Sequence, residues 1–211
     1  MQTIDWTLYA IIDHDWLKGR DIQNVGEQLI AGGAGIIQYR NHTSDDNQFY
    51  LEAGRLAEIT QQLGVPLVIN NRADIAQAVY ADGVHVGQND LPCEAVRRLV
   101  GPTKTIGLSV RNLEEYDRAN HMDYLGVGAL FPTKTKTDAK HCGLDLVKTI
   151  RKEFDKPLIG IGGITLENVA DVILSGCDGV AVISAILGRE DIQNAAREFV
   201  DRIQETRHRF L

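Results

Sequence analysis

Short apolar runs alternate with longer amphipathic stretches along almost the whole chain. Eight of these runs are rich in Ile and Val and bounded by Gly, Pro, Asp or Asn, which is typical of β-strands. They comprise residues 6–12, 35–40, 66–70, 83–87, 104–109, 123–128, 157–162 and 179–184. Because the runs are continuously apolar, they predict strands that are buried on both faces, as in a parallel sheet.

The segments between the runs have apolar positions three or four residues apart, the spacing of a helix with one buried face. Residues 45–64 show this spacing, and Gly64 predicts the end of that helix. Residues 165–176 predict another helix, which Thr165 caps and Gly176 ends. The same periodicity occurs in residues 146–154 and 192–207.

Eight alternating strand and helix units predict an α/β fold, a single (β/α)8 TIM barrel. An open doubly wound sheet is the main competing architecture, but eight is the number of units that closes into a barrel. The length of 211 residues is near the lower limit of roughly 200 residues for this fold. No linker or low-complexity stretch divides the sequence, so we expect residues 1–211 to form one domain.

The composition, with 44% hydrophobic and 24% charged residues, is that of an ordinary globular protein. A net charge of −7 argues against a nucleic-acid-binding surface, which is normally basic, but it leaves room for a local basic pocket. The three cysteines are far apart and form no CxxC pair, so we expect free thiols. The first residues lack the pattern of a signal peptide or membrane anchor, which favours a cytoplasmic protein.

Almost every predicted strand ends in a polar or glycine-rich cluster, which is where barrels of this class carry their chemistry. The glycine-rich turns after the seventh and eighth strands are typical of phosphate sites, because their backbone N–H groups bind anions. Arg40, Lys134 and Lys136 supply positive charge for a second anionic group. Asp90, together with Asn71, offers oxygen ligands for Mg²⁺. The pattern therefore predicts two phosphorylated substrates, one of them a diphosphate.

Each of these clusters also has a purely structural interpretation. Arg40, taken alone, would form a surface ion pair with Asp45 or Asp46. Asp90, taken alone, would close a turn or begin the next helix. His85 lies within a predicted strand, and we interpret it as a hydrogen-bonded core histidine rather than a ligand.

Seven stretches, in order, resemble the thiamine-phosphate synthase family over nearly the whole chain. They are "QYR", "VINNRADIA", "DGVHVGQNDLP", "IGLS", "DYLGVGALFPTKTK", "GIGGIT" and "VAVISAI". The parts "GVHVGQNDLP" and "FPTKTK" are the most specific, whereas the glycine turns alone would fit other phosphate-binding barrels.

The resemblance implies a Mg²⁺-dependent transferase. It would join 4-amino-5-hydroxymethyl-2-methylpyrimidine diphosphate to 4-methyl-5-(2-hydroxyethyl)thiazole phosphate, giving thiamine phosphate and pyrophosphate. By analogy, the carbon–oxygen bond breaks first and the thiazole nitrogen attacks the resulting methylene cation, so no protein nucleophile is needed. The implied partners are these small molecules, with no nucleic acid or membrane, and a homo-oligomer is left open.

Carried over to this sequence, the resemblance implies a role for each matching residue. Gln38 and Ser109 would bind the pyrimidine. The diphosphate would be bound by Arg40, Asn70, Thr133, Thr135 and Lys136. Asp90 would bind Mg²⁺, and the backbone amides of Gly163, Ile183 and Ser184 would bind the thiazole phosphate. Ser109, Lys136 and Arg40 are the expected catalytic residues.

Two positions depart from the family pattern. The family usually has an aspartate that binds magnesium where this chain has Asn71, so we expect weaker metal binding. His42 stands where a lysine that binds pyrophosphate is common. An imidazole with an ordinary pKa of about 6.5 is only partly charged at neutral pH, so His42 predicts an unusual pH dependence.

Three alternative functions fit parts of the sequence. A thiazole tautomerase-like relative would share the barrel and the thiazole-phosphate site, and the weakened metal site favours it. A non-catalytic regulator that binds thiazole phosphate belongs to a different class. A sugar-phosphate isomerase would need a carboxylate base, and no glutamate stands at a predicted strand end.

Overall fold

The computed structural model describes residues 4–133 and 141–210. Within these residues, eight parallel strands form a closed barrel in which each strand pairs with its neighbours in sequence and β8 pairs with β1. The strands are β1 (Leu8–Asp13), β2 (Ile36–Arg40), β3 (Leu67–Asn70), β4 (Gly83–Val86), β5 (Thr105–Val110), β6 (Tyr124–Val127), β7 (Leu158–Ile161) and β8 (Gly179–Val182). The predicted (β/α)8 barrel is confirmed.

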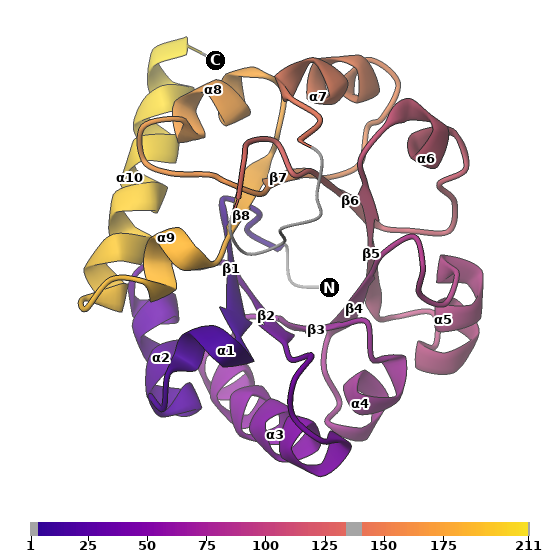
Figure 1. Ribbon diagram of the computed structural model, residues 1–211, viewed down its shortest axis with the longest axis vertical. Helices are drawn as coiled ribbons and strands as arrows, with labels where there is room; N and C mark the ends of the chain where they lie inside the picture. The colour runs from indigo at the N-terminus through magenta and orange to yellow at the C-terminus, as the bar shows by residue number, and fades with distance from the viewer. Residues whose placement is uncertain (1–3, 134–140, 211) are drawn as a thin grey trace.

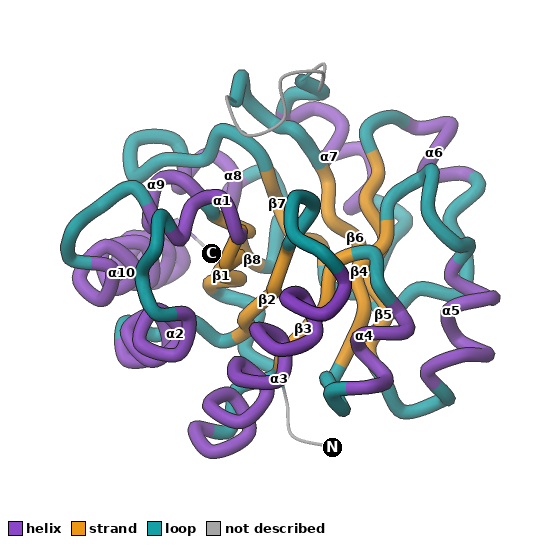
Figure 2. The backbone as a smooth tube through the Cα atoms, turned by 60° about the horizontal axis from the view of Figure 1, so that its bottom comes forward, coloured by secondary structure: helices purple, strands orange, loops and turns teal. Residues whose placement is uncertain are grey.

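Helices surround the ring of strands, as seen down the barrel in Figure 1 and from the side in Figure 2. They are α1 (His14–Leu17), α2 (Ile22–Ala31), α3 (Asp46–Leu63), α4 (Ala73–Ala78), α5 (Cys93–Val100), α6 (Leu113–Asp117), α7 (Leu144–Arg151), α8 (Val169–Leu174), α9 (Ser184–Leu187) and α10 (Ile192–Phe210). The last helix, α10, packs against both α8 and α2, so the helical layer closes where the barrel closes.

The predicted helix ends are confirmed in one case and wrong in another. Gly64 ends α3 in the left-handed conformation, with φ +69°, as predicted. The helix predicted from residue 165 instead begins at Val169, with Asn168 as its N-cap. The side chain of Asn168 accepts from the N–H of Thr165 at 2.8 Å, which holds residues 165–168 in a turn.

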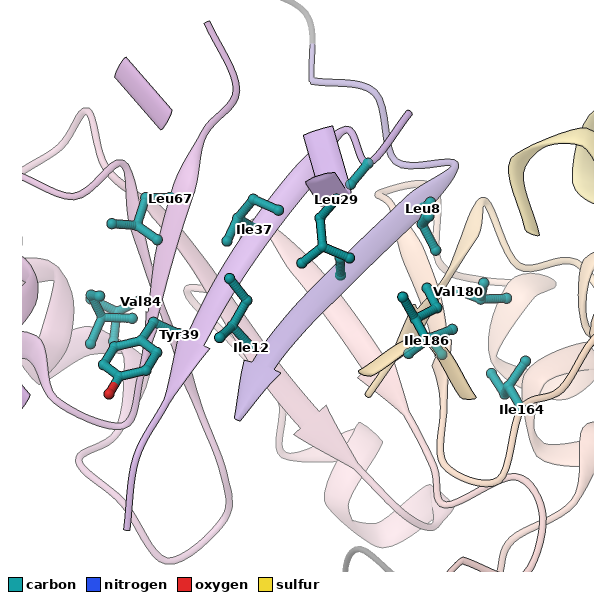
Figure 3. Packing of buried hydrophobic residues seen from close by; sticks show 14 of the residues in the cluster. Leu8, Ile12, Leu29, Ile37, Tyr39, Leu67, Val84, Ile164, Val180 and Ile186 are labelled. Carbon is teal, nitrogen blue, oxygen red and sulfur yellow. The ribbon is translucent and has the colours of Figure 1, made fainter. Parts of the chain in front are cut away.

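The strands are buried on both faces because their alternate side chains enter two separate apolar clusters. In β1, Leu8, Ala10 and Ile12 point toward the helices and join the large outer cluster. Figure 3 shows Leu8 and Ile12 in this layer, with Ile37 and Leu67 from the next two strands. Tyr9 and Ile11 point the other way, into a smaller cluster inside the barrel. This division explains the continuous apolar runs in the sequence.

Three aspartates form the same backbone clamp at the amino-terminal ends of successive strand pairs. The N–H of Asp123 donates to the carbonyl of Ile106 at 2.7 Å, and its Oδ2 accepts from the N–H of Ile106 at 2.7 Å. Asp82 binds Leu67 in the same reciprocal way, and so does Asp178 with Leu158. The clamps join β3 to β4, β5 to β6 and β7 to β8 at the end opposite the predicted site.

Two further features of the described residues bear on the sequence predictions. Cys93, Cys142 and Cys177 are free thiols, as expected. Among the helices that the structure describes, none is long and apolar enough to cross a membrane.

Candidate active site

A cavity of about 600 Å³ opens at the carboxyl ends of the strands and extends down into the barrel. Strands β1 to β8 or the loops after them all contribute to its wall. The predicted site residues that line it are Gln38, Arg40, Asn70, Asn71, Asp90, Ser109, Thr133, Gly163, Ile183 and Ser184. Residues from seven different strands or strand ends, far apart in the sequence, are thus brought to one place.

Three predicted residues are not placed at this cavity. His42 is exposed in the loop between β2 and α3 and is not among the residues that line the cavity. Thr135 and Lys136 lie outside the described residues, as does Lys134. The contribution of residues 134–136 therefore stays a prediction, whereas Thr133, which precedes them, does line the cavity.

Arg40 ends β2 and is held against a buried carboxylate at the end of the neighbouring strand. Its Nη1 donates to Oδ2 of Asp13, which is 3% exposed and is the last residue of β1. Asp13 also caps α1, since its Oδ1 accepts from the N–H of Asp15 at 3.1 Å. A guanidinium has further N–H groups in the same plane, so pairing with Asp13 leaves donors that can bind an anion in the cavity.

The expected surface partners of Arg40 are engaged elsewhere. Asp45 caps α3, with its Oδ1 accepting from the N–H of Gln48 at 2.8 Å. Asp46 accepts from Nη1 of Arg72 at 2.6 Å. The interpretation of Arg40 as a surface partner of Asp45 or Asp46 is therefore wrong, because Asp13 is fixed beside Arg40 by strand pairing.

Asp90 lies in a tight turn after β4. Its Oδ2 accepts from the N–H of Gly87 at 2.7 Å, and its own N–H donates to the carbonyl of Gly87 at 3.2 Å. The next helix, α5, begins at Cys93 with Pro92 as the N-cap, so Asp90 closes a turn and does not cap the helix. Asp90 lines the cavity, and its hydrogen bond to Gly87 uses one of its two carboxylate oxygens, Oδ2.

Asn71 follows β3 in the left-handed backbone conformation, with φ +64°. Its N–H donates to the carbonyl of His85 at 2.8 Å, which fixes this loop to β4. Asn and Asp are the non-glycine residues that best tolerate this conformation. The backbone therefore restricts which side chains can occupy position 71.

The donor set suits a hard divalent cation. Asp90 is the acidic residue among those that line the cavity, and the side chains of Asn70 and Asn71 add amide oxygens. Within the described residues no three His, Cys, Asp or Glu side chains form a metal-binding group. Oxygen ligands with one carboxylate match Mg²⁺ that is completed by water and substrate phosphates.

Five side chains form a hydrogen-bonded chain across the barrel interior. Nε2 of Gln38 donates to the hydroxyl of Tyr9 at 2.8 Å, and the hydroxyls of Tyr9 and Tyr124 lie 2.7 Å apart. Nδ1 of His85 lies 2.8 Å from the Tyr124 hydroxyl, and its Nε2 lies 2.8 Å from Oγ of Ser109. All five residues line the cavity. His85 is hydrogen-bonded, as expected, but it also belongs to the site.

Two glycines make room for this chain. A Cβ atom on Gly107 would lie 2.1 Å from Cζ of Tyr124 and 2.4 Å from Nδ1 of His85. A Cβ on Gly126 would lie 3.1 Å from Cε1 of His85. The tyrosine and the histidine thus fill the space that two missing side chains leave inside β5 and β6.

Tyr9 and Tyr124 line the cavity but were not predicted from the sequence. The available signal was the alternation of side chains along a strand. Tyr124 is two residues before Gly126, and Tyr9 is two residues before Ile11, so each shares a strand face with a residue that lines the cavity. Arg111, beside Ser109, was also missed, and its guanidinium is held by Glu115 at 2.8 Å.

The glycine-rich turn after β7 has a backbone that requires glycine. Gly162 and Gly163 have φ +92° and +66°, and a Cβ on Gly163 would lie 2.5 Å from the carbonyl of Pro132. The side chain of Asn168 donates to the carbonyl of Gly163 at 3.0 Å. This turn lines the cavity, and so do Ile183 and Ser184, which follow β8 directly.

Comparisons with known proteins agree with this geometry. The sequence model of a family described as "Thiamine monophosphate synthase" matches residues 8–186. The thiamine-phosphate synthase of Alkaliphilus oremlandii is 48% identical over 92% of this chain and 94% of its own length. That of Clostridium tetani is 41% identical over 97% and 99%.

Solved structures of similar fold include one of a thiamine phosphate pyrophosphorylase. A thiamine phosphate pyrophosphorylase from Pyrococcus furiosus superposes with a TM-score of 0.87 and is 36% identical, covering 96% of this chain and 98% of its own. A structure titled "Native KDPGal structure" has a TM-score of 0.75 at 18% identity, which shows a shared fold alone.

Proposed function

The chain belongs to the thiamine monophosphate synthase family, and we propose that it joins 4-amino-5-hydroxymethyl-2-methylpyrimidine diphosphate to 4-methyl-5-(2-hydroxyethyl)thiazole phosphate. The products are thiamine phosphate and pyrophosphate, so the enzyme is a transferase. One observation supports this reaction above the others: a single cavity brings together Arg40, Asp90 and the Gly163 turn. A cation, a metal-binding carboxylate and a phosphate-binding backbone are the groups that two phosphorylated substrates need.

The proposed substrate sites divide the cavity. Gln38 and Ser109, inside the barrel, bind the pyrimidine ring, and Arg40 and Asn70 at the strand ends bind its diphosphate. Backbone amides of Gly163, Ile183 and Ser184 bind the thiazole phosphate. Thr133 lines the cavity on the diphosphate side of this proposal, with Thr135 and Lys136 expected to follow it in the chain.

The proposed reaction is a substitution at the methylene carbon of the pyrimidine. The carbon–oxygen bond breaks, the bonding electrons leave with pyrophosphate, and the lone pair of the thiazole nitrogen forms the new carbon–nitrogen bond. Arg40 donates to the departing diphosphate, and the buried Asp13 keeps the guanidinium in place. Ile159, Ile161 and Ala181 give the barrel wall an apolar part that limits water near the reactive carbon.

We propose that Asp90 and Asn71 hold Mg²⁺ when the diphosphate is bound. The ion would neutralise the charge of the leaving pyrophosphate. Asp90 already uses Oδ2 to bind Gly87, so Oδ1 is the oxygen available to a metal. With one carboxylate rather than two, the site should need the diphosphate for tight metal binding.

The alternative functions are less well supported. Relatives named thiamine-phosphate synthase are 41–48% identical over more than nine-tenths of this chain. Such similarity favours the synthase over a thiazole tautomerase-like relative or a non-catalytic regulator. Arg40 and Asp90, which those alternatives do not require, both line the cavity.

The proposed function is tested by a coupling assay with both substrates and Mg²⁺ varied from none to excess. Oxidising the product to thiochrome gives a fluorescent signal. We expect Mg²⁺-dependent product, and we expect Asp90→Asn to raise the Mg²⁺ concentration needed for half-maximal rate. If no product forms at any Mg²⁺ concentration while thiazole phosphate still binds, the regulator or tautomerase function replaces this one.

A further inference from the structure

The hydrogen-bonded chain inside the barrel has two ends that face the cavity, Gln38 and Ser109, and three members between them. Tyr9 and Tyr124 are each 1% exposed, so neither hydroxyl exchanges hydrogen bonds freely with water. A buried polar chain must satisfy its donors and acceptors internally. The positions of its protons can therefore be worked out by counting.

Each hydrogen bond in the chain needs one proton, and Tyr9, Tyr124 and neutral His85 can each donate one. Burial raises the pKa of both tyrosine hydroxyls well above their usual range, so both stay protonated and each donates once. A neutral imidazole donates from one nitrogen and accepts at the other. Once the direction of one link is fixed, the directions of the remaining links follow.

Gln38 fixes the direction. Its Nε2 donates to the Tyr9 hydroxyl, so Tyr9 donates to Tyr124, and Tyr124 donates to Nδ1 of His85. Nε2 of His85 then carries the proton and donates to Oγ of Ser109. The hydroxyl proton of Ser109 is left for the cavity.

The opposite direction is self-consistent only if the Gln38 amide turns round. With Nε2 donating to Tyr9, a reversed chain would leave the proton of the buried Tyr9 hydroxyl with no acceptor among the described residues, which is unfavourable. With the amide turned, Gln38 would donate into the cavity and Ser109 would accept. The chain therefore couples its two ends: one accepts from a ligand and the other donates to it.

We infer that His85 and Tyr124 are positioning residues that set the hydrogen-bonding polarity of the pyrimidine site. Oε1 of Gln38 is the acceptor and the Ser109 hydroxyl is the donor. A 4-aminopyrimidine presents an amino donor next to a ring-nitrogen acceptor, and this matches the two ends. The 4-oxo counterpart presents a carbonyl acceptor next to a ring N–H donor, which is the reversed polarity. The choice of a 4-aminopyrimidine as the ligand rests on the proposed function. The arrangement of protons along the chain rests only on the hydrogen bonds between its members.

The proton arrangement is tested first, on the unliganded wild-type protein. Nitrogen NMR of protein labelled with ¹⁵N-histidine distinguishes the two neutral tautomers and the imidazolium. His85→Gln identifies the His85 signals among those of the six histidines. We expect the Nε2–H tautomer at pH 7. An Nδ1–H tautomer or a charged ring overturns the inference, whatever the activity assay shows.

The selectivity is tested with the two pyrimidine methanols, 4-amino and 4-oxo, which carry no leaving diphosphate and so isolate binding from reactivity. By calorimetry, we expect the wild type to bind the 4-oxo compound on the order of 100-fold more weakly, because two buried partners are left mismatched. Tyr124→Phe removes the proton that Nδ1 accepts, so it should reduce this ratio to less than about tenfold. Tyr80→Phe, at a residue that is 86% exposed and remote from the cavity, is the matched control and should keep the wild-type ratio.

An unchanged ratio in Tyr124→Phe, or no selectivity in the wild type, overturns the inference and leaves the synthase function intact. If the coupling assay gives no product with the 4-amino diphosphate, the proposed function fails instead. The tautomer measurement then still decides whether the chain has the inferred direction.

Discussion

At position 71 the backbone and the expected chemistry make separate demands on one side chain. A φ of +64° is costly for most residues, and Asn and Asp tolerate it best. Both carry an oxygen that can bind a cation, so a change between them preserves the loop and alters the charge. This makes Asn71→Asp a direct test of the metal site.

We predict that Asn71→Asp lowers the Mg²⁺ concentration for half-maximal coupling rate by roughly 30-fold. One added charge about 4 Å from a divalent ion is worth about 2 kcal/mol in a water-like medium, and about 30-fold is the corresponding change in affinity. The measurement is an Mg²⁺ titration of the coupling rate. Asn120→Asp, at an exposed residue outside the cavity, makes the same change in net charge and should leave the titration unaltered. Equal titrations for wild type and Asn71→Asp would contradict a metal contact at this position.

A second prediction concerns the geometry of the guanidinium at position 40. Arg40→Lys keeps a cation beside the buried Asp13 but loses the planar set of donors that binds carboxylate and phosphate together. We expect kcat/KM for the pyrimidine diphosphate to fall about 10- to 100-fold, as for the loss of one charged hydrogen bond worth about 1.5–3 kcal/mol. Steady-state kinetics measures this. Arg55→Lys, in an exposed ion pair with Asp21, is the control, and a comparable loss there would show that the effect is not specific.

How far the site could be predicted depends on where each residue stands in its strand. Arg40 and Asn70 stand at strand ends, where a polar residue after an apolar run is conspicuous in the sequence. Tyr9 and Tyr124 lie within apolar runs that are buried on both faces. There, the sequence does not distinguish the side that faces the helices from the side that faces the barrel interior. The partner of Arg40 was mispredicted because Asp13 is 27 residues away and is brought close only by the pairing of β1 with β2.

Three of the strand pairs are joined at their amino-terminal ends by aspartate hydrogen bonds that were not predicted from the sequence. Asp82, Asp123 and Asp178 each precede an even-numbered strand and bind the strand before it through both N–H and carboxylate. Arg97 and Arg151 bind Asp123 and Asp178, respectively, at 2.6 Å. The site lies at the opposite end of the same strands, so these contacts can serve stability without taking part in catalysis.

We predict that Asp123→Ala lowers the free energy of unfolding by about 1–3 kcal/mol, because the N–H of Ile106 loses its acceptor. Asp123→Asn retains an oxygen acceptor and loses only the ion pair with Arg97, so it should cost about 0–1 kcal/mol. Urea denaturation measures both values. Asp117→Ala, at the exposed end of α6, is expected to stay within about 0.5 kcal/mol of wild type. Equal losses in the alanine and asparagine variants would mean that the ion pair, not the backbone clamp, carries the effect.

The helix boundaries show which local signals are reliable. Gly64 ends α3 because the backbone there is left-handed, and glycine signals that conformation directly. Thr165 has the chemistry of an N-cap, but Asn168 competes for the same role and holds residues 165–168 in a turn. Two good capping residues three positions apart cannot be ranked without knowing how the glycine turn before them, at residues 162–163, is packed.

For the molecule as a whole, the count of strand and helix units was sufficient to predict a closed barrel, since eight parallel strands close on themselves. The arrangement inside the barrel was not predictable in the same way. Inside the barrel, a large side chain from one strand needs a glycine on a neighbouring strand at the same height. The residue on one strand therefore depends on the residues of the strands beside it. Gly107 and Gly126, from β5 and β6, accommodate the ring of His85 from β4, and Gly107 also accommodates Tyr124 from β6.

This coupling leads to a prediction about Gly107. A Cβ at this position would lie 2.1 Å from Cζ of Tyr124, much closer than real Cβ contacts, so the tyrosine and His85 would have to move. We expect Gly107→Ala to lower the free energy of unfolding by about 1–3 kcal/mol through overpacking and to reduce the coupling rate, because the chain that ends at Ser109 is displaced. Urea denaturation and the thiochrome assay measure the two effects.

The matched control is Gly54→Ala in α3, where an added Cβ meets nothing within 4 Å. The same chemical change there should stabilise the protein by about 0.5–1 kcal/mol, since alanine favours the helix, and should leave the coupling rate unaltered. If glycine-to-alanine substitution lowers the free energy of unfolding at position 107 and raises it at position 54, the side chains of the barrel interior pack directly against Gly107. If Gly107→Ala were as stable and as active as the wild type, Tyr124 and His85 would have room to shift, and the barrel interior could not hold the proton arrangement that links Gln38 to Ser109.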